Sequence, residues 1–305
     1  MSRKPKEPET VPAVSPESPL VPNARLRQIY TMMLDCRLAA GRFAALAAEG
    51  RVAAALQPAV AEEALLAATA VDLRTGDTLC FAPQDWLAAM LKGVPLAVLA
   101  RHLFASTGSR PRALREDALR LCALPSDPAK HPAIALEAAL AHKRRKGTLA
   151  IVYTAGCTSL AGWEKVLQAA GSRRLPLLIV CRTPFLPLPT AAVPAEGTLE
   201  SLAHANGIPQ ILVDGRDALA VYRVAQEAAG RARRGIGATL IECQSEGAAQ
   251  LDAADPIAGM ERHLASKGIF SPEWKQEAIS AFAQQLDAAF AAASRARRTV
   301  STTNH

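Results

Sequence analysis

The sequence predicts an α/β protein in which a parallel sheet is flanked by helices on both faces. Three observations lead to this prediction. Short apolar runs alternate with segments whose apolar residues recur at helical spacing. The short runs are rich in β-branched residues, as buried parallel strands are. Half of the 305 residues are hydrophobic while only 4% are aromatic, which suits a helix-rich chain with an ample core.

The clearest β-α-β unit lies in the middle of the chain. Leu149–Tyr153 reads as a buried strand, Ser159–Gly171 as an amphipathic helix, and Leu177–Cys181 as a second strand that Pro184 stops. In such units ligands bind where strand ends meet helix N-termini. Two strand ends come together here, at Thr154–Thr158 and Arg182–Pro184, so this edge of the sheet is the expected site.

The remaining elements follow the same alternation. A long amphipathic helix is expected over Leu26–Ala48, and another helix starts near Pro132. Asp217 and Asp255 are the expected N-caps of two later helices. The other expected elements are a helix at Thr198–Ala205, a strand and turn at Ile208–Gly215, a strand at Ala238–Cys243, and a last helix from Ser271-Pro272 to about Arg295.

We expect one domain with two extensions. Residues 1–22 are rich in Pro, Glu, Lys and Ser and are predicted to be a disordered N-terminal arm. Residues 23–295 form the single domain, and residues 296–305 a flexible tail.

Composition narrows the function classes. No apolar run approaches the ~20 residues of a membrane span, and the first residues lack the apolar core of a signal peptide, so we expect a cytoplasmic protein without a membrane partner. The six cysteines include no Cys-x-x-Cys pair, which favours single buried thiols over a metal cluster. The net charge is +7, but the basic clusters fall at expected helix C-termini without interleaved aromatics. They indicate a solvated surface or one facing an acidic partner, and no nucleic-acid site.

Several segments resemble one family over residues 26 to about 290. They are LRQIYTMMLDCRLAAGRF near the start, GIPQILVDGRDALAVYRVAQEAAGRARRGIGATLIEC at Gly207–Cys243, and DPIAGMERHLASKGIFS from Asp255. They resemble α subunits of the thiamine-diphosphate-dependent 2-oxo acid dehydrogenases (pyruvate, branched-chain and acetoin dehydrogenase complexes). The resemblance implies a thiamine-diphosphate-binding fold, a magnesium ion that anchors the cofactor's diphosphate, and a site shared with a β subunit.

The residues that the family uses for the cofactor are replaced in this chain. Its Gly-Asp-Gly falls on Thr154, Ala155 and Gly156, and its Asn pair on Thr183 and Pro184. In the family, the Asp and an Asn hold magnesium. Neither Ala155 nor the Pro184 side chain offers a ligand atom, and Thr183 offers only a neutral hydroxyl.

Other family motifs are altered too. The Tyr-Arg pair that reaches the cofactor is replaced by Pro83 and Gln84. In the His-x-x-x-Gly-Gln-Glu-Ala stretch, only the Glu and the Ala persist; the corresponding residues here are Gln57, Ala61, Glu62, Glu63 and Ala64. The chain is short between Leu103 and Leu149, where the family has a His-containing loop, and residues 244–254 contain no His. We interpret His131 as a surface residue at a helix start, and His263 as a surface or interface residue.

These losses favour a non-catalytic α-like subunit, without thiamine diphosphate or magnesium, that pairs with a β-like chain in a hetero- or homo-oligomer. Two alternatives remain. One is an active thiamine-diphosphate-dependent oxidoreductase, with a rearranged site, that decarboxylates 2-oxo acids oxidatively. The other is a phosphate or small-anion binding module that uses Thr154, Gly156, Thr158 and Ser159 at a helix N-terminus. The Rossmann fingerprint is absent, so a dinucleotide site has little support.

Overall fold

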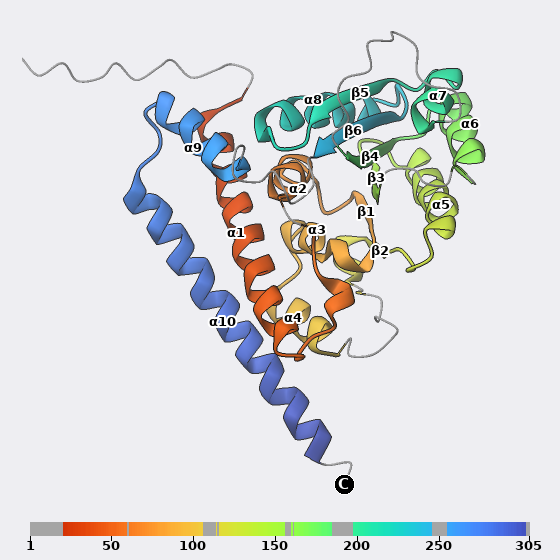
Figure 1. Ribbon diagram of the computed structural model, residues 1–305. Helices are drawn as coiled ribbons and strands as arrows, with labels where there is room; N and C mark the ends of the chain where they lie inside the picture. The colour runs from red at the N-terminus through yellow and green to blue at the C-terminus, as the bar shows by residue number, and fades with distance from the viewer. Residues whose placement is uncertain are drawn as a thin grey trace, which may run out of the picture.

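A parallel sheet forms the centre of the molecule (Figure 1). The computed structural model describes residues 21–59, 61–105, 114, 116–155, 160, 162–184, 198–245 and 255–302. Within them six strands, all parallel to their neighbours, run in the order β2-β1-β3-β4-β6-β5. The strands are β1 (Thr78–Phe81), β2 (Leu121–Ala123), β3 (Ala150–Ala155), β4 (Leu177–Pro184), β5 (Gln210–Asp214) and β6 (Thr239–Ser245).

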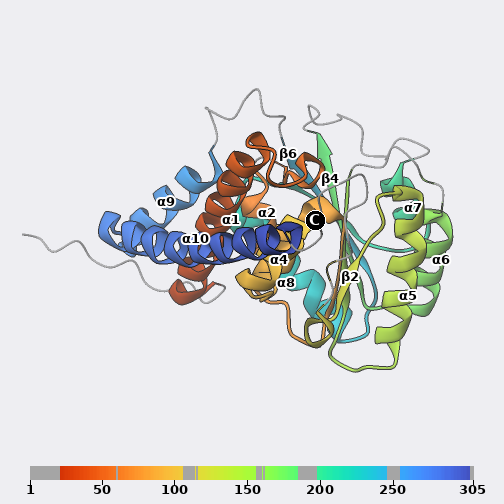
Figure 2. The ribbon, with the colours of Figure 1, turned by 90° about the horizontal axis from the view of Figure 1, so that it is seen from below.

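Helices cover both faces of the sheet, as Figure 2 shows from below. One face carries α5 (His131–Lys143), α6 (Trp163–Arg173) and α7 (Leu199–Ala205). The other carries α1 (Asn23–Ala48), α2 (Glu63–Ala70), α3 (Trp86–Leu91), α4 (Leu96–Ala105), α8 (Ala218–Arg233), α9 (Pro256–Ser266) and α10 (Pro272–Thr302). Of these, α9 and α10 pack on α1 and α4 rather than on the strands. The predicted fold class is confirmed.

The middle strands are apolar throughout because both of their faces are buried. Ile151 and Tyr153 of β3 belong to the core beneath α2 and α8, while Ala150 and Val152 belong to the core beneath α5 and α6. Each fully buried aliphatic side chain stabilises the fold by roughly 1.5–3 kcal/mol. The strand-like composition of this segment therefore reflects its central place in the sheet.

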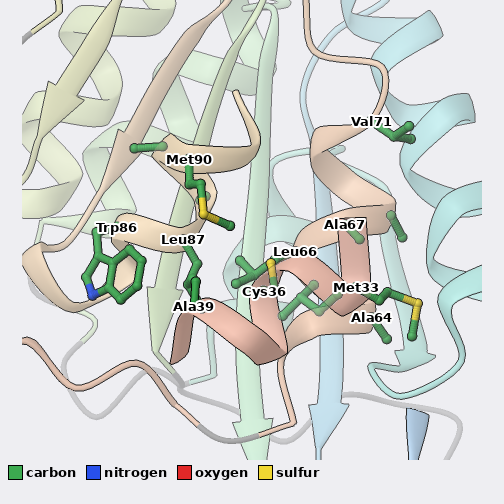
Figure 3. Packing of buried hydrophobic residues seen from close by; sticks show 14 of the residues in the cluster. Met33, Cys36, Ala39, Ala64, Leu66, Ala67, Val71, Trp86, Leu87 and Met90 are labelled. Atoms are coloured by element: carbon green, nitrogen blue, oxygen red, sulfur yellow. The ribbon is translucent and has the colours of Figure 1, made fainter. Parts of the chain in front are cut away.

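Helix α1 is buried along the face that its apolar spacing predicts. Figure 3 shows Cys36 of this helix close to Leu66 of α2. Small residues such as Ala64 let the helices approach closely (Figure 3). The alanine-rich composition is thus used for helix packing as well as for helix propensity.

The last helix packs along α1 and α4 through aromatic contacts. The Tyr30 ring lies 5.4 Å from Trp274, and Phe104 lies 5.9 Å from Phe290, centroid to centroid. The helix continues through Thr302, beyond the end expected near Arg295. Within the described residues, no helix is both long enough and apolar enough to cross a bilayer.

A buried carboxylate joins the amino ends of β1 and β3. Asp77 is fully buried and accepts hydrogen bonds from the backbone amides of Arg74 (2.8 Å) and Leu149 (3.0 Å). The guanidinium of Arg233 donates to the same carboxylate at 2.6 Å. Asp77 thereby ties α8 to the amino edge of the sheet.

Strand β2 is an element that the sequence patterns did not predict. It has three residues, all half-buried, and Arg120 precedes it with a left-handed backbone (φ 49°). Among the described residues its one neighbouring strand is β1, with Leu79 opposite Leu121 and Phe81 opposite Ala123. A run this short carries no periodic pattern, so only pairing with a strand about 40 residues earlier in the chain defines it.

Candidate functional site

The expected site lies at the carboxyl edge of the sheet, around the ends of β1, β3 and β4. After β1 the chain passes over the α1–α4 face to reach β2, whereas after β3 it passes through α6 on the opposite face. Strands β1 and β3 are neighbours, so this point is a topological switch point, where open α/β sheets bind their ligands. The structure thus gives this edge the topology of a ligand site.

The structure brings most of the predicted site residues to this edge. Thr154 and Ala155 end β3 opposite Cys181 and Arg182, and Thr183 and Pro184 end β4 one step further on. Thr154 is buried, and the hydroxyl of Thr183 is buried without a hydrogen-bond partner.

The other predicted positions are divided between η2 and a part of the chain outside the described residues. Pro83 and Gln84 begin the short helix η2 (Pro83–Asp85), directly after β1. Gln84 is exposed and Pro83 is half-buried. Gly156 lies outside the described residues, as do Thr158 and Ser159.

A buried ion cluster connects three segments at this edge. Arg182 of β4 donates to Asp85 through both terminal nitrogens, Nη1 to Oδ1 at 2.7 Å and Nη2 to Oδ2 at 3.0 Å. Its Nη1 also donates to Oε2 of Glu62 at 2.9 Å. The side chains are 10% (Arg182), 3% (Asp85) and 11% (Glu62) exposed. We call these three residues the edge cluster.

Each member of the edge cluster comes from a segment that resembles a cofactor motif. Glu62 stands where the family motif has Gln, directly before the start of α2. Asp85 follows the Pro83-Gln84 pair, and Arg182 precedes the Thr183-Pro184 pair. Three segments that would meet around a cofactor therefore meet around an arginine.

The positive charge of Arg182 is compensated within the edge cluster. Burial raises the pKa of Glu62, an effect that Arg182 opposes and Asp85 reinforces. Burial disfavours the charge of Arg182, but the carboxylates of Asp85 and Glu62 raise its pKa above the ordinary value. Two carboxylates and one guanidinium leave one negative charge, so the cluster disfavours a further anion.

A second ion cluster lies beside the first. Arg37 of α1 donates to both oxygens of Asp255, at 2.7 and 3.0 Å, and contacts Oε1 of Glu63. The hydrogen bond from Arg37 holds the pKa of Asp255 below its ordinary range, although burial opposes this. Asp255 also caps α9, so this cluster anchors α9 to α1 and α2. Glu63, the one acidic residue of the family motif that persists, is used here for structure.

The turn before α2 contains a residue with a left-handed backbone. Ala61 stands where the family motif has Gly, and it adopts a left-handed conformation with φ 62°. This conformation costs an L-residue roughly 1–2 kcal/mol relative to glycine. The turn before α2 therefore holds an alanine in a conformation that favours glycine.

The residues at this edge do not fit a diphosphate with a magnesium ion. Magnesium needs oxygen ligands, usually one or two carboxylates together with phosphate oxygens. The carboxylates of Glu62 and Asp85 are both engaged by Arg182, and Pro83 carries no donor. Among the described residues, no group of three or more His, Cys, Asp or Glu side chains is placed to hold a metal ion.

The two histidines singled out from the sequence lie away from the edge cluster. His131 was expected at the surface, but it is 7% exposed and its Nε2 lies 2.8 Å from the carbonyl of Pro125, so that prediction was wrong. The ring closes the turn that leads into α5. His263 is half-buried beside a cavity of about 300 Å³ between α8 and α9, and burial lowers its pKa.

The helix that was expected to begin at Ser159 begins at Trp163. Its N-cap is Gly162, which has φ 88° and offers no side chain for capping. The anion-site alternative needed hydroxyls at the first turn of this helix. The helix begins later than that alternative assumed, and Thr158 and Ser159 are not among the described residues.

Sequence reasoning did not find the edge cluster, although it named the segments involved. The sequence did contain one signal, namely charged residues near the strand ends. Arg182 follows the apolar run of β4, and Asp85 follows β1. Their pairing could not be inferred, because the partners are separated by 97 and 120 residues along the chain.

Comparisons with known proteins agree with the resemblance seen in the sequence. The family profile described as dehydrogenase E1 component matches residues 30–300. The pyruvate dehydrogenase E1 component subunit alpha of Staphylococcus aureus (strain Mu50) is 31% identical over 169 residues, covering 48% of this chain and 46% of that protein. The protein of the same name from Staphylococcus epidermidis (strain RP62A) is 29% identical over the same length.

The aligned region spans about half the length of these curated relatives, whereas the family profile covers most of the chain. Fold, motif order and profile are consistent with one another. The chain belongs to the dehydrogenase E1 component family and is of the α-subunit type.

Proposed function

We propose that this chain is a non-catalytic α-like subunit that has lost the thiamine diphosphate and magnesium site of its family. It acts as a structural or regulatory subunit and pairs with a β-like chain. The observation that carries the proposal is the edge cluster, in which Arg182 is bound by Asp85 and Glu62 at the switch point of the sheet.

The charge of the edge cluster opposes the binding of a diphosphate. A diphosphate carries several negative charges and needs a cation to hold it. At this edge, Arg182 is already neutralised, and the cluster as a whole is negative. Freeing a buried arginine from its carboxylates typically costs about 3–5 kcal/mol. Cofactor binding would have to supply this free energy and also bring a metal for which the sequence offers no carboxylate at position 155.

The direct test is calorimetry with thiamine diphosphate and magnesium chloride. The full chain is titrated alone and then as a complex with the E1 β-type chain that it captures in its native host. A thiamine-diphosphate-binding dehydrogenase measured alongside is the positive control. We expect no saturable heat from either sample up to millimolar cofactor. Saturable binding with a magnesium requirement would refute the loss of the site.

The pairing is tested separately by tagging the chain in its native host. Captured chains are identified by mass spectrometry after crosslinking. We expect a chain whose sequence is of the E1 β type, in stoichiometric amount. A chain that purifies alone as a monodisperse monomer would contradict the subunit role and leave the cofactor result unaffected.

The second candidate is an active oxidoreductase with a rearranged site. One observation favours it: the Thr183 hydroxyl at the end of β4 is buried and has no hydrogen-bond partner. A ligand oxygen or a water molecule would satisfy it. If calorimetry detects cofactor binding, Thr183→Val should weaken it at least about tenfold, as expected for the loss of one hydrogen bond to a charged group.

A further inference from the structure

Two cysteines lie opposite one another at the outer edge of the sheet. Cys80 of β1 and Cys122 of β2 are register partners in neighbouring parallel strands. Both belong to the α5–α7 face, where Cys80 is part of the core and Cys122 packs against it. Neighbouring strands lie about 4.8 Å apart, within the roughly 4.4–6.8 Å between Cα atoms that a disulfide spans.

The two thiols also interact directly. Interaction with the Cys80 thiol lowers the pKa of Cys122, against the opposing effects of burial and of Glu137. The same interaction and complete burial raise the pKa of Cys80. Both directions favour Cys122 over Cys80 as the sulfur that ionises first.

Cys122 is also the more solvent-exposed of the two cysteines. Cys122 is half-buried on the outermost strand, whereas Cys80 is completely buried. A small oxidant from solvent therefore reaches the Cys122 sulfur before it reaches the buried Cys80 sulfur. Reactive cysteines combine thiolate character, access and a nearby resolving thiol in this way.

The other described cysteines lack these features. Cys36, Cys181 and Cys243 are buried. The strand partners of Cys181 are Thr154 and Glu242, and those of Cys243 are Arg182 and Val213. Among the described residues, Cys80 and Cys122 are thus the one pair of cysteines in register.

We propose that Cys80 and Cys122 form a reversible disulfide in response to hydrogen peroxide or an alkyl hydroperoxide. The Cys122 thiolate attacks a peroxide oxygen, the O–O bond breaks, and hydroxide or alkoxide leaves. The Cys80 sulfur then attacks the Cys122 sulfenic acid, the S–O bond breaks, and the departing hydroxide takes the Cys80 proton as water. With hydrogen peroxide, two thiols lose two electrons and one peroxide becomes two waters.

The bond would tie β2 to the sheet. Strand β2 has three residues and one described neighbour, β1. A covalent link between Cys80 and Cys122 closes the segment that carries α3 and α4, and it restricts the opening of this edge. A thiol reductant reverses the step by attack on the more accessible Cys122 sulfur.

The test uses the full chain, reduced, desalted and treated with a graded series of hydrogen peroxide. Remaining thiols are alkylated before peptide mapping without reduction. We expect a linked pair of peptides containing Cys80 and Cys122, a mass loss of about 2 Da, and full reversal by dithiothreitol. Oxidation of Cys122 to sulfinic or sulfonic acid without the link would overturn the proposal. So would a link from either residue to Cys157 or to another chain.

Two single variants assign the roles. In Cys80→Ser we expect Cys122 to accumulate sulfenic acid, which a dimedone probe traps. In Cys122→Ser we expect Cys80 to stay unmodified at the same dose. Cys36→Ala is the matched control and should form the link as the unmodified chain does. Because the mapping is done on the unmodified chain, the proposal remains testable even if a serine variant fails to fold. Equal labelling of Cys80 and Cys122 by the probe would contradict the assigned order.

Discussion

The two edges of the sheet both bury a carboxylate against an arginine, but they do so in different ways. At the amino edge, Asp77 accepts two backbone amides in addition to Arg233, so the acid is part of the turns that start β1 and β3. At the carboxyl edge, Arg182 binds two side-chain carboxylates, from α2 and η2.

The comparison separates an acid that the fold requires from an ion cluster that the fold merely contains. Removing Asp77 exposes unsatisfied backbone groups in the interior. The edge cluster, in contrast, could be replaced by uncharged side chains of similar shape.

The largest effect is expected at the amino edge. Asp77→Ala leaves the guanidinium of Arg233 and the amides of Arg74 and Leu149 without their acceptor. We expect the free energy of unfolding to fall by about 3–5 kcal/mol, measured by urea denaturation. Asp287→Ala, which removes an exposed pair with Arg42, is the control and should cost less than about 1 kcal/mol. A loss below that of the control would contradict the distinction between the edges.

A smaller effect is expected at the carboxyl edge. Arg182→Met leaves Glu62 and Asp85 facing each other, and we expect a loss of about 2–3 kcal/mol, since protonation relieves part of the repulsion. The combined variant Arg182→Met, Glu62→Gln, Asp85→Asn removes all three charges. We expect it to recover most of that loss in the same urea assay. A triple variant less stable than Arg182→Met would mean that the fold needs the edge cluster.

A third acid, Asp35, differs from those at the two edges because burial alone raises its pKa. Asp35 lines a groove between α1 and α10 beside Met32 and Phe282, and burial raises its pKa to about 7. The folded state then binds the proton more tightly than the unfolded state does. The stabilising proton is fully bound below the unfolded pKa near 4, and its contribution is lost as pH rises through 7.

Asp35→Asn should remove the loss of stability that occurs as the pH rises through 7. We expect the variant to gain roughly 1–2 kcal/mol at pH 8 relative to the unmodified chain, after allowance for partial exposure, and to show a flatter stability profile between about pH 4 and 7. Urea midpoints across this range measure the effect. Asp287→Asn on α10, where the acid is exposed, is the control and should leave the profile unchanged. A profile of the Asp35 variant that keeps its slope would refute the assignment.

The smallest effect concerns the turn at the start of α2. Ala61 holds a left-handed conformation that glycine adopts freely. Ala61→Gly should raise the free energy of unfolding by up to about 1 kcal/mol, because relief of backbone strain exceeds the loss of one buried methyl. Ala64→Gly, within α2, is the matched control and should lower stability by about 1 kcal/mol or more. A clear loss of stability in Ala61→Gly would show that the backbone at this position is not strained.

Much of the fold followed from local patterns. The run Leu177–Val180 indicated a buried strand because β-branched, apolar segments are stable only with both faces covered. Asp217 and Asp255 indicated helix starts because a carboxylate satisfies the first free amides of a helix, and both accept such bonds. The family followed from motif order.

Other features depended on partners far away in the chain. Strand β2 exists because β1 offers it a free edge, and the thiols of Cys80 and Cys122 meet only through that pairing. His131 was expected at the surface, but folding buries it beside the carbonyl of Pro125.

The sequence by itself determined most of the helices and strands and which family residues are replaced, because helix periodicity, strand composition and capping are local properties. Only the tertiary structure decided what Arg182, Glu62 and Asp85 do. Three charges spread over 120 residues acquire a role when folding brings them out of water and next to one another. The physical reason is that burial makes the pairing of charges obligatory, and burial is a property of the packed chain.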